Sequence, residues 1–176
     1  MVHIAVAFAN TVRVSTGDAL ATAAGLTAWL RERRSELEVR LDEADLLAIG
    51  DDEAAAARRA RDAVRALMGG ARETDEHVRA LNDAVRAAPR WRELAWGEPP
   101  SVTARSAQPP VLAAVAEVAE QAILLLTGPD RDHVRPCGAP GCVQFFLKEH
   151  PRREWCSTGC GNRVRVARHY ARTKGA

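Results

Sequence analysis

The four cysteines constrain this chain more than any other feature, because all of them lie in its last quarter. They form two close pairs with the spacing C-x4-C-x13-C-x3-C, at Cys137, Cys142, Cys156 and Cys160. A tetrahedral metal site requires this arrangement, since each pair supplies two ligands from one local turn and the intervening segment closes the tetrahedron. The spacing therefore predicts one metal-binding module at the end of the chain.

Zinc is the natural occupant of such a site. Four thiolates select zinc or an iron–sulfur centre, and a short segment without a cofactor partner favours one structural Zn²⁺ ion. A catalytic zinc keeps a position open for water, whereas four thiolates close the coordination sphere. The alternatives are two disulfides, which a reducing compartment disfavours, or four free thiols. His133 and His150 lie beside the cysteines as reserve ligands.

The residues around the cysteines predict a treble-clef-like zinc finger. Glycine and proline between Cys137 and Cys142 allow a tight turn, and the β-branched and aromatic run 143–147 predicts a strand. Residues 154–157 could return against that strand as a hairpin. Cys156 and Cys160 are four residues apart, so a helix starting there would place both sulfurs on one face.

The segment after the last cysteine predicts an amphipathic, basic helix. On a helical wheel Cys156, Cys160, Val164, Ala167 and Ala171 share the side expected to face the zinc, opposite a stripe of arginines with His169. Such a stripe can neutralise DNA phosphates or reach base edges in the major groove. The alternative is that the arginines only solvate a terminal helix. The predicted DNA contacts are Arg152, Arg153, Arg163, Arg165, Arg168 and Arg172.

The charge distribution favours the first of these alternatives. Residues 131–176 carry ten Lys or Arg against three Asp or Glu, whereas residues 1–130 carry fifteen against twenty. An acidic region followed by a basic one indicates a polyanionic partner for the second region. We place the domain boundary between residues 129 and 130, where turn-forming residues coincide with this shift.

The first domain, residues 1–129, is predicted to be α+β and mainly helical, with a small antiparallel sheet. Helices are expected after Asp18 or Thr22, over 42–68 with an interruption at Gly50, from Thr74 or Asp75 to Pro89, and from Val111 to Thr127. Strands are expected over 3–14, 91–96 and 101–107, the last two pairing as a hairpin that joins the first. Trp91 and Trp96 could fill a core or line a pocket.

Membrane and enzyme functions find little support. The most apolar run, 111–127, contains Glu117 and Glu120, which predicts a buried helix and not a membrane span. The first residues do not resemble a signal peptide, so we expect a cytoplasmic protein. Acidic clusters at 42–45 and 51–53 are expected to cap helices, and we predict no catalytic residues.

The tetrapeptide Cys160-Gly161-Asn162-Arg163, with CGAPGCVQFFLK before it, resembles the CGNR zinc-finger family, and the preceding chain resembles the ABATE domain usually coupled to that finger. The resemblance covers nearly the full length. It implies a bacterial protein, the four cysteines as zinc ligands, an α+β first domain, and a stress-induced transcription regulator. Lys148 to Pro151 depart from the more uniformly basic hairpin expected of that family, which favours helix contacts over hairpin contacts to DNA.

These observations predict a zinc-dependent, DNA-binding transcription regulator whose first domain senses a small molecule or a protein partner. The alternative is a zinc-stapled protein interaction module that does not bind DNA directly. The effector, the DNA sequence and the oligomeric state stay open.

Overall fold

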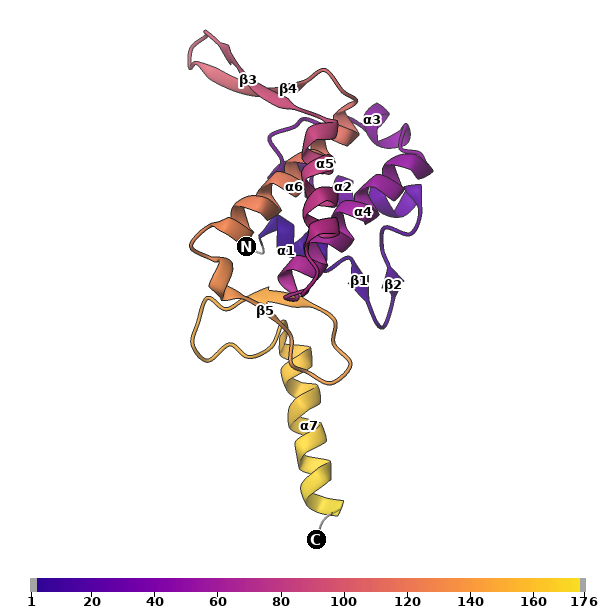
Figure 1. Cartoon of the computed structure of the whole chain (residues 1–176), viewed down its shortest axis with the longest axis vertical. Helices are drawn as coiled ribbons and strands as arrows, with labels where there is room; N and C mark the ends of the chain where they lie inside the picture. Colours follow the sequence, from indigo (N-terminus) through magenta and orange to yellow (C-terminus); the bar gives the residue numbers. More distant parts are fainter. Residues whose placement is uncertain (1–2, 175–176) are drawn as a thin grey trace.

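The computed structural model describes residues 3–174, apart from the side chains of residues 171, 173 and 174. It confirms a mostly helical N-terminal region with small antiparallel sheets, followed by the cysteine-rich segment, which is an α+β architecture (Figure 1). The helices of the N-terminal region are α1 (Ile4–Ala9), α2 (Ala23–Arg33), α3 (Glu43–Leu47), α4 (Asp51–Met68), α5 (Asp75–Ala87) and α6 (Pro110–Thr127).

Helix α6 is the centre of the N-terminal region. It packs against α1, α4 and α5, and ten of its eighteen residues are buried. By length and composition α6 could also cross a membrane, but a core helix passes the same test and the burial of α6 is that of a core helix. Glu117 lies within this buried face and accepts hydrogen bonds from the backbone N–H groups of Glu38 (2.7 Å) and Val39 (2.9 Å). This carboxylate holds the loop after α2 against α6.

The predicted strand over residues 3–14 is wrong for most of its length. Residues 4–9 form α1, whose N-terminal N–H at Ala5 donates to the His3 ring, and the strand pair that follows is only β1 (Val12–Arg13) with β2 (Gly17–Asp18). Phe8 is fully buried and packs at 5.2 Å from Trp29, measured between ring centroids. A short apolar run that is buried on nearly all sides carries no alternation, so its composition could not distinguish helix from strand.

A buried ion pair fixes the β1–β2 hairpin to α4. Arg61 is 2% exposed and donates two hydrogen bonds of 2.8 Å to the Asp18 carboxylate. It also donates to the Thr11 hydroxyl and to Asp62. The hydrogen bonds from Arg61 hold the pKa of Asp18 below its usual value.

The predicted helix boundaries are confirmed elsewhere in this region. Thr22 caps α2 through its hydroxyl, Gly50 separates α3 from α4, and Gly69 follows the end of α4. The acidic residues Asp42 and Asp45 form a reciprocal capping box at the start of α3, which is the capping role expected of that cluster.

The predicted second hairpin is present, but it stands apart from the other strands. Strands β3 (Arg90–Ala95) and β4 (Ser101–Ser106) pair antiparallel along their full length and form a two-stranded sheet of their own. The hairpin extends away from the helices (Figure 1). Trp91 is 47% exposed and Trp96 is 86% exposed, so neither fills the core.

Candidate metal centre

The first cysteine pair lies in the turn of a hairpin made by β5 (Val134–Pro136) and β6 (Phe145–Leu147). The N–H of Cys137 donates to the Gln144 carbonyl at 2.8 Å and that of Cys142 to the Ala139 carbonyl at 2.9 Å, which closes the turn. Gly141 adopts a φ of +70°, a conformation that favours glycine. The predicted pairing of 143–147 with 154–157 is therefore wrong, because β6 uses the segment before the first cysteine as its partner.

The second pair is positioned by the start of α7 (Thr158–Lys174). Cys156 precedes this helix, and Cys160 lies in its first turn, where its N–H donates to the Ser157 hydroxyl at 3.2 Å. Trp155 packs against the buried cluster that contains Cys137 and Cys160. A Cβ at Gly161 would lie 3.0 Å from the Trp155 ring and one at Gly138 would lie 3.4 Å from it, so glycine lets both segments approach the indole closely.

The structure brings the four predicted ligands together. All four Sγ atoms lie within 4.8 Å of one another, and Cys142, Cys156 and Cys160 are separated by 3.5 to 3.7 Å. A tetrahedral zinc with Zn–S bonds of about 2.3 Å places its sulfurs about 3.8 Å apart. The sulfurs are too far apart for disulfides, whose bond length is about 2.05 Å. The geometry fits one structural zinc ion.

The chemistry of the thiols supports the same conclusion. Burial, followed by the neighbouring thiols, raises the pKa of Cys156 far above its usual value. Burial also acts to raise the pKa of Cys160, but hydrogen bonding to Ser157 and to the other thiols lowers it to about 7. Four thiolates cannot ionise side by side without a cation between them, and a bound zinc supplies that charge.

The reserve ligands are not part of this cluster. His133 lies against Asp130, with its Nδ1 atom 3.2 Å from the carboxylate, and His150 accepts the N–H of Arg152 at 3.1 Å. Within the described residues the metal-ligating group consists of the four cysteines.

Two of the predicted DNA-contacting arginines contact residues of the metal centre. Arg163 donates to Cys160 Sγ at 3.3 Å, and such contacts tune the charge on a ligand sulfur. Arg153 stacks 5.2 Å above the Phe146 ring and donates to the Cys156 carbonyl, so it holds the loop before α7. Arg152 is exposed in the same loop, which joins β6 to α7 and is not a hairpin turn.

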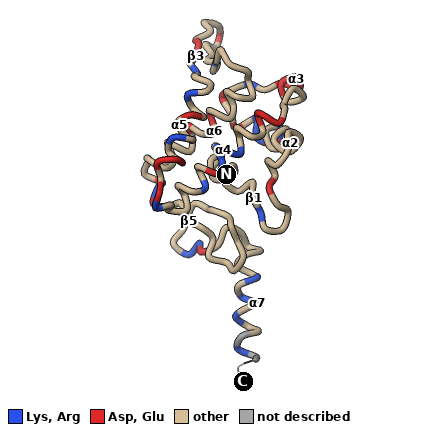
Figure 2. Tube along the Cα trace, turned by 45° about the vertical axis from the view of Figure 1, so that its right-hand side comes forward, with Lys and Arg blue, Asp and Glu red and all other residues tan. Residues whose placement is uncertain are grey.

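Helix α7 extends away from the rest of the molecule (Figure 1). Val164 is its last buried residue, and every described side chain beyond it is exposed, including Arg165, Arg168 and Arg172. The prediction that Ala167 faces the zinc is therefore wrong, and the predicted position of Ala171 falls on a side chain outside the described ones. Lys and Arg are spaced along α7, which contains no acidic residue (Figure 2).

A clamp that the sequence did not reveal joins this module to the N-terminal region. The Asn10 side chain donates to the Phe145 carbonyl at 2.9 Å and accepts the Phe145 N–H at 2.7 Å, so it pairs with β6 as a strand would. Arg65 donates to the Ala9 and Val143 carbonyls and stacks on Phe145. Val134 and Phe145 are buried in one cluster with residues of α1, α4 and α6.

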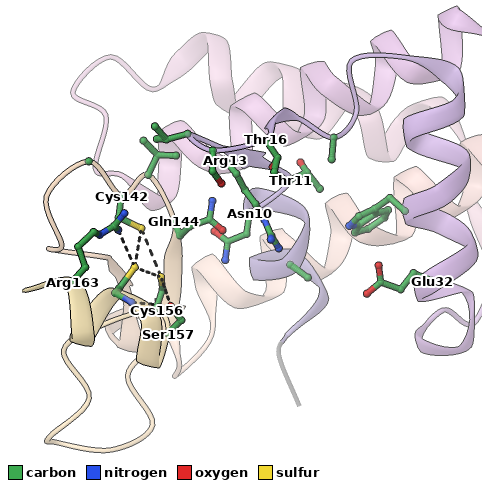
Figure 3. A pocket seen from close by; sticks show the side chains of 18 of the residues that line it. Asn10, Thr11, Arg13, Thr16, Glu32, Cys142, Gln144, Cys156, Ser157 and Arg163 are labelled. Carbon is green, nitrogen blue, oxygen red and sulfur yellow. Dashed lines mark hydrogen bonds between the residues drawn. The ribbon is translucent and has the colours of Figure 1, made fainter.

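A cleft of about 750 Å³ lies between the two regions (Figure 3). The β1–β2 hairpin and α2 line one side of it, with Arg13, Thr16 and Glu32, and the metal centre lines the other, with Cys142 and Arg163. Within the described residues Arg13 makes no ion pair. Arg33 also lines the cleft but is paired with Glu32 and Glu36. The cleft therefore has Arg13 in its first wall and ligand cysteines in its second.

Two family models match successive parts of the chain. Residues 2–129 match the ABATE family model, described as "Putative stress-induced transcription regulator", and residues 133–173 match the CGNR zinc finger. A search of curated proteins found no match.

Proposed function

This chain belongs to the ABATE family and carries a CGNR zinc finger, and from that premise we propose that it is a zinc-dependent transcription regulator that binds duplex DNA through α7. Residues 1–129 form its sensor or interaction domain and residues 130–176 its DNA-binding finger. Cys137, Cys142, Cys156 and Cys160 hold one structural zinc, and the protein acts in the cytoplasm.

The observation that carries this proposal is the exposed, basic part of α7. An α-helix with its side chains is about 10–12 Å wide, which matches a major groove about 12 Å wide. Because nothing covers the described side chains beyond Val164, the helix can enter the groove without rearranging the rest of the chain. Arg165, Arg168 and Arg172 supply the contacts to phosphates or base edges, and Arg152 extends them at the base of the helix.

The test measures binding of the zinc-loaded full chain to labelled duplex DNA by fluorescence anisotropy at several salt concentrations. The full chain is needed because Val134 and Phe145 of the finger belong to a core that the N-terminal region completes. We expect affinity to fall steeply with salt, since each neutralised phosphate contributes about −0.9 to the slope of log K against log salt.

Replacing Arg165, Arg168 and Arg172 by Gln should weaken binding about tenfold or more and flatten that slope by about three. The matched control replaces Arg59, Arg72 and Arg79, which are exposed on or beside α4 and α5, and removes the same charge. If the two triple variants lost the same DNA affinity, the loss would be explained by net charge and not by the position of the arginines on α7. Wild-type protein that binds no DNA but captures an acidic protein would instead support the interaction module.

The cleft between the two regions supports the sensor role of the first domain. Arg13 of the first region and Cys142 and Arg163 of the finger all line this cleft. A compound bound there therefore contacts both the sensor domain and the metal centre. An effector of this kind should change the DNA affinity of the wild-type chain and have less effect on the Arg13→Gln variant.

A further inference from the structure

The β3–β4 hairpin presents an exposed apolar end that its own chain does not cover. Leu94 and Val102 lie opposite each other in the register, 67% and 60% exposed, and Trp96 follows β3 at 86% exposed. Glu98 lies in the turn beyond them. We refer to Leu94, Trp96 and Glu98 as the hairpin tip. Two-stranded hairpins are marginally stable alone in water, so an uncovered apolar tip indicates a partner.

A groove of about 800 Å³ lies at the base of the same hairpin. The loop 37–42 forms one wall, and Arg92, Val102 and Ala104 form the other. The groove has an apolar floor, since Val39 and Leu41 are buried and Leu37 packs against the core beside them. The buried Glu117 carboxylate accepts hydrogen bonds from the backbone of this loop and so fixes the position of that wall.

The tip and the groove lie on one face of the hairpin. Arg92 and Ala104 are paired in the register, two residues from the Leu94–Val102 pair, and alternate residues of a strand share a face. A two-fold axis beside that face brings the tip of each copy to the groove of the other, as a self-complementary interface requires.

The charges of the two surfaces are also complementary. Glu98 of the tip and Arg40 of the groove are both exposed, and neither has an ion-pair partner within residues 3–174. The other charged groups of the groove are engaged in the same chain: Arg92 binds Glu38, Arg34 binds Glu43, and Asp42 and Asp45 cap α3. The tip therefore carries a free acid and the groove a free base.

We propose that the occupant of this groove is the hairpin tip of a second copy of the chain, so that the protein forms a two-fold dimer through reciprocal insertion of β3–β4. Helix α7 lies at the other end of the molecule from the hairpin (Figure 1). Dimer formation therefore leaves the DNA-binding helix of each copy accessible.

Sedimentation velocity of the zinc-loaded full chain over a range of concentrations tests this proposal. The wild type should be a dimer, and Leu94→Ser with Trp96→Ser should raise the dimer dissociation constant by at least about a hundredfold, since two apolar side chains of each copy lose their burial in the two-fold interface. The control pair, Val78→Ser with Leu124→Ser, removes exposed apolar side chains from α5 and α6 and should not change it. Unchanged DNA affinity per chain in the tip variant distinguishes this interface from the proposed DNA contacts.

A charge exchange identifies the occupant. Glu98→Arg and Arg40→Glu should each weaken self-association several-fold, because each places like charges opposite one another. An equimolar mixture of the two single variants should recover the dimer, because both cross-interface pairs are then complementary, and so should the double variant in one chain. A monomeric wild type at about 100 µM, well above the micromolar dissociation constants of stable complexes, would overturn the proposal. The proposal would also be overturned if the equimolar mixture of Glu98→Arg and Arg40→Glu did not form the dimer.

Discussion

The N-terminal region and the finger are stabilised in different ways. The first buries large apolar side chains such as Phe8, Leu20 and Leu26 around α6, which is the ordinary basis of a folded domain. The finger has a cluster of its own that consists of little more than Phe146, Val164 and Ala139 beside the cysteines. A segment this small cannot bury enough apolar surface to fold by packing alone, so the metal must supply the difference.

Because one region is stabilised by apolar packing and the other by a metal ion, we expect a single perturbation to unfold one region and leave the other folded. Apolar packing depends on many contacts, and the loss of one weakens it gradually. A four-thiolate site depends on one ion, and its loss removes most of the stabilisation in one step. The following changes test how far the two regions are independent.

Loss of the metal should have the largest effect. Cys156→Ser, or chelation of the wild type, should abolish zinc binding and unfold the start of α7, because structural zinc contributes about 10–16 kcal/mol to such modules. Metal analysis and hydrogen exchange together measure this, with α6 expected to keep its protection. Glu154→Gln, exposed two residues before Cys156, serves as the control that retains zinc. Equal loss of protection in α6 and α7 would show that the regions unfold as one unit.

A change within the first region should lower the stability of that region and leave zinc binding unchanged. Asp18→Asn leaves the buried Arg61 with Asp62 as its only carboxylate partner, and breaking such a pair costs about 3 kcal/mol. Chemical denaturation followed by far-ultraviolet circular dichroism should show this loss while zinc content stays the same. Asp52→Asn, exposed at the start of α4, is a control of matched charge.

The same variant has a predicted pH dependence. Because the folded state lowers the pKa of Asp18, its contribution is present above the unfolded value of about 3.9 and is lost as the pH falls through the lower folded value. The wild type should therefore lose its advantage over Asp18→Asn below about pH 4. An advantage that persists at pH 2 would contradict the assigned role of the ion pair.

The smallest expected effect lies at the junction. Asn10→Ala removes both hydrogen bonds to Phe145 and leaves the N–H and carbonyl of Phe145 unpaired. The expected loss in the free energy of unfolding is about 1–3 kcal/mol. We expect faster hydrogen exchange in β6 with unchanged zinc stoichiometry. Asn82→Ala, on α5 away from the finger, is the control. An unchanged β6 would mean that Arg65 and the buried Phe145 ring hold the junction without the amide.

Sequence patterns predicted the features that depend on neighbouring residues. Thr22, Gly50 and Gly69 act through local capping chemistry, so the ends of α2, α3 and α4 could be located without knowledge of the fold. The cysteine spacing indicated the metal centre for the same reason, since each close pair belongs to one turn.

Features that depend on distant residues were missed or assigned wrongly. Strand β6 could pair with a segment on either side of it, and nothing local favours Val134–Pro136 over residues 154–157. Asn10 is the C-terminal cap of α1, which is a local role, but its side chain binds Phe145, which is 135 residues away. No sequence pattern indicated that Trp155 would lie against Gly138 and Gly161. The hydrogen bond from Arg163, a predicted DNA contact, to the Cys160 sulfur was also not foreseen.

The clamp formed by Asn10, Arg65 and Phe145 affects whether the finger can fold when it is transferred to another protein. A graft that moved only the cysteine segment onto another protein would carry Phe145 without the amide and guanidinium that receive it. A working chimera should therefore include the α1 end and the α4 turn that carry Asn10 and Arg65. Recombination between such proteins would be expected to exchange the two regions together, because a break anywhere between Arg65 and Val143 separates the partners of this clamp.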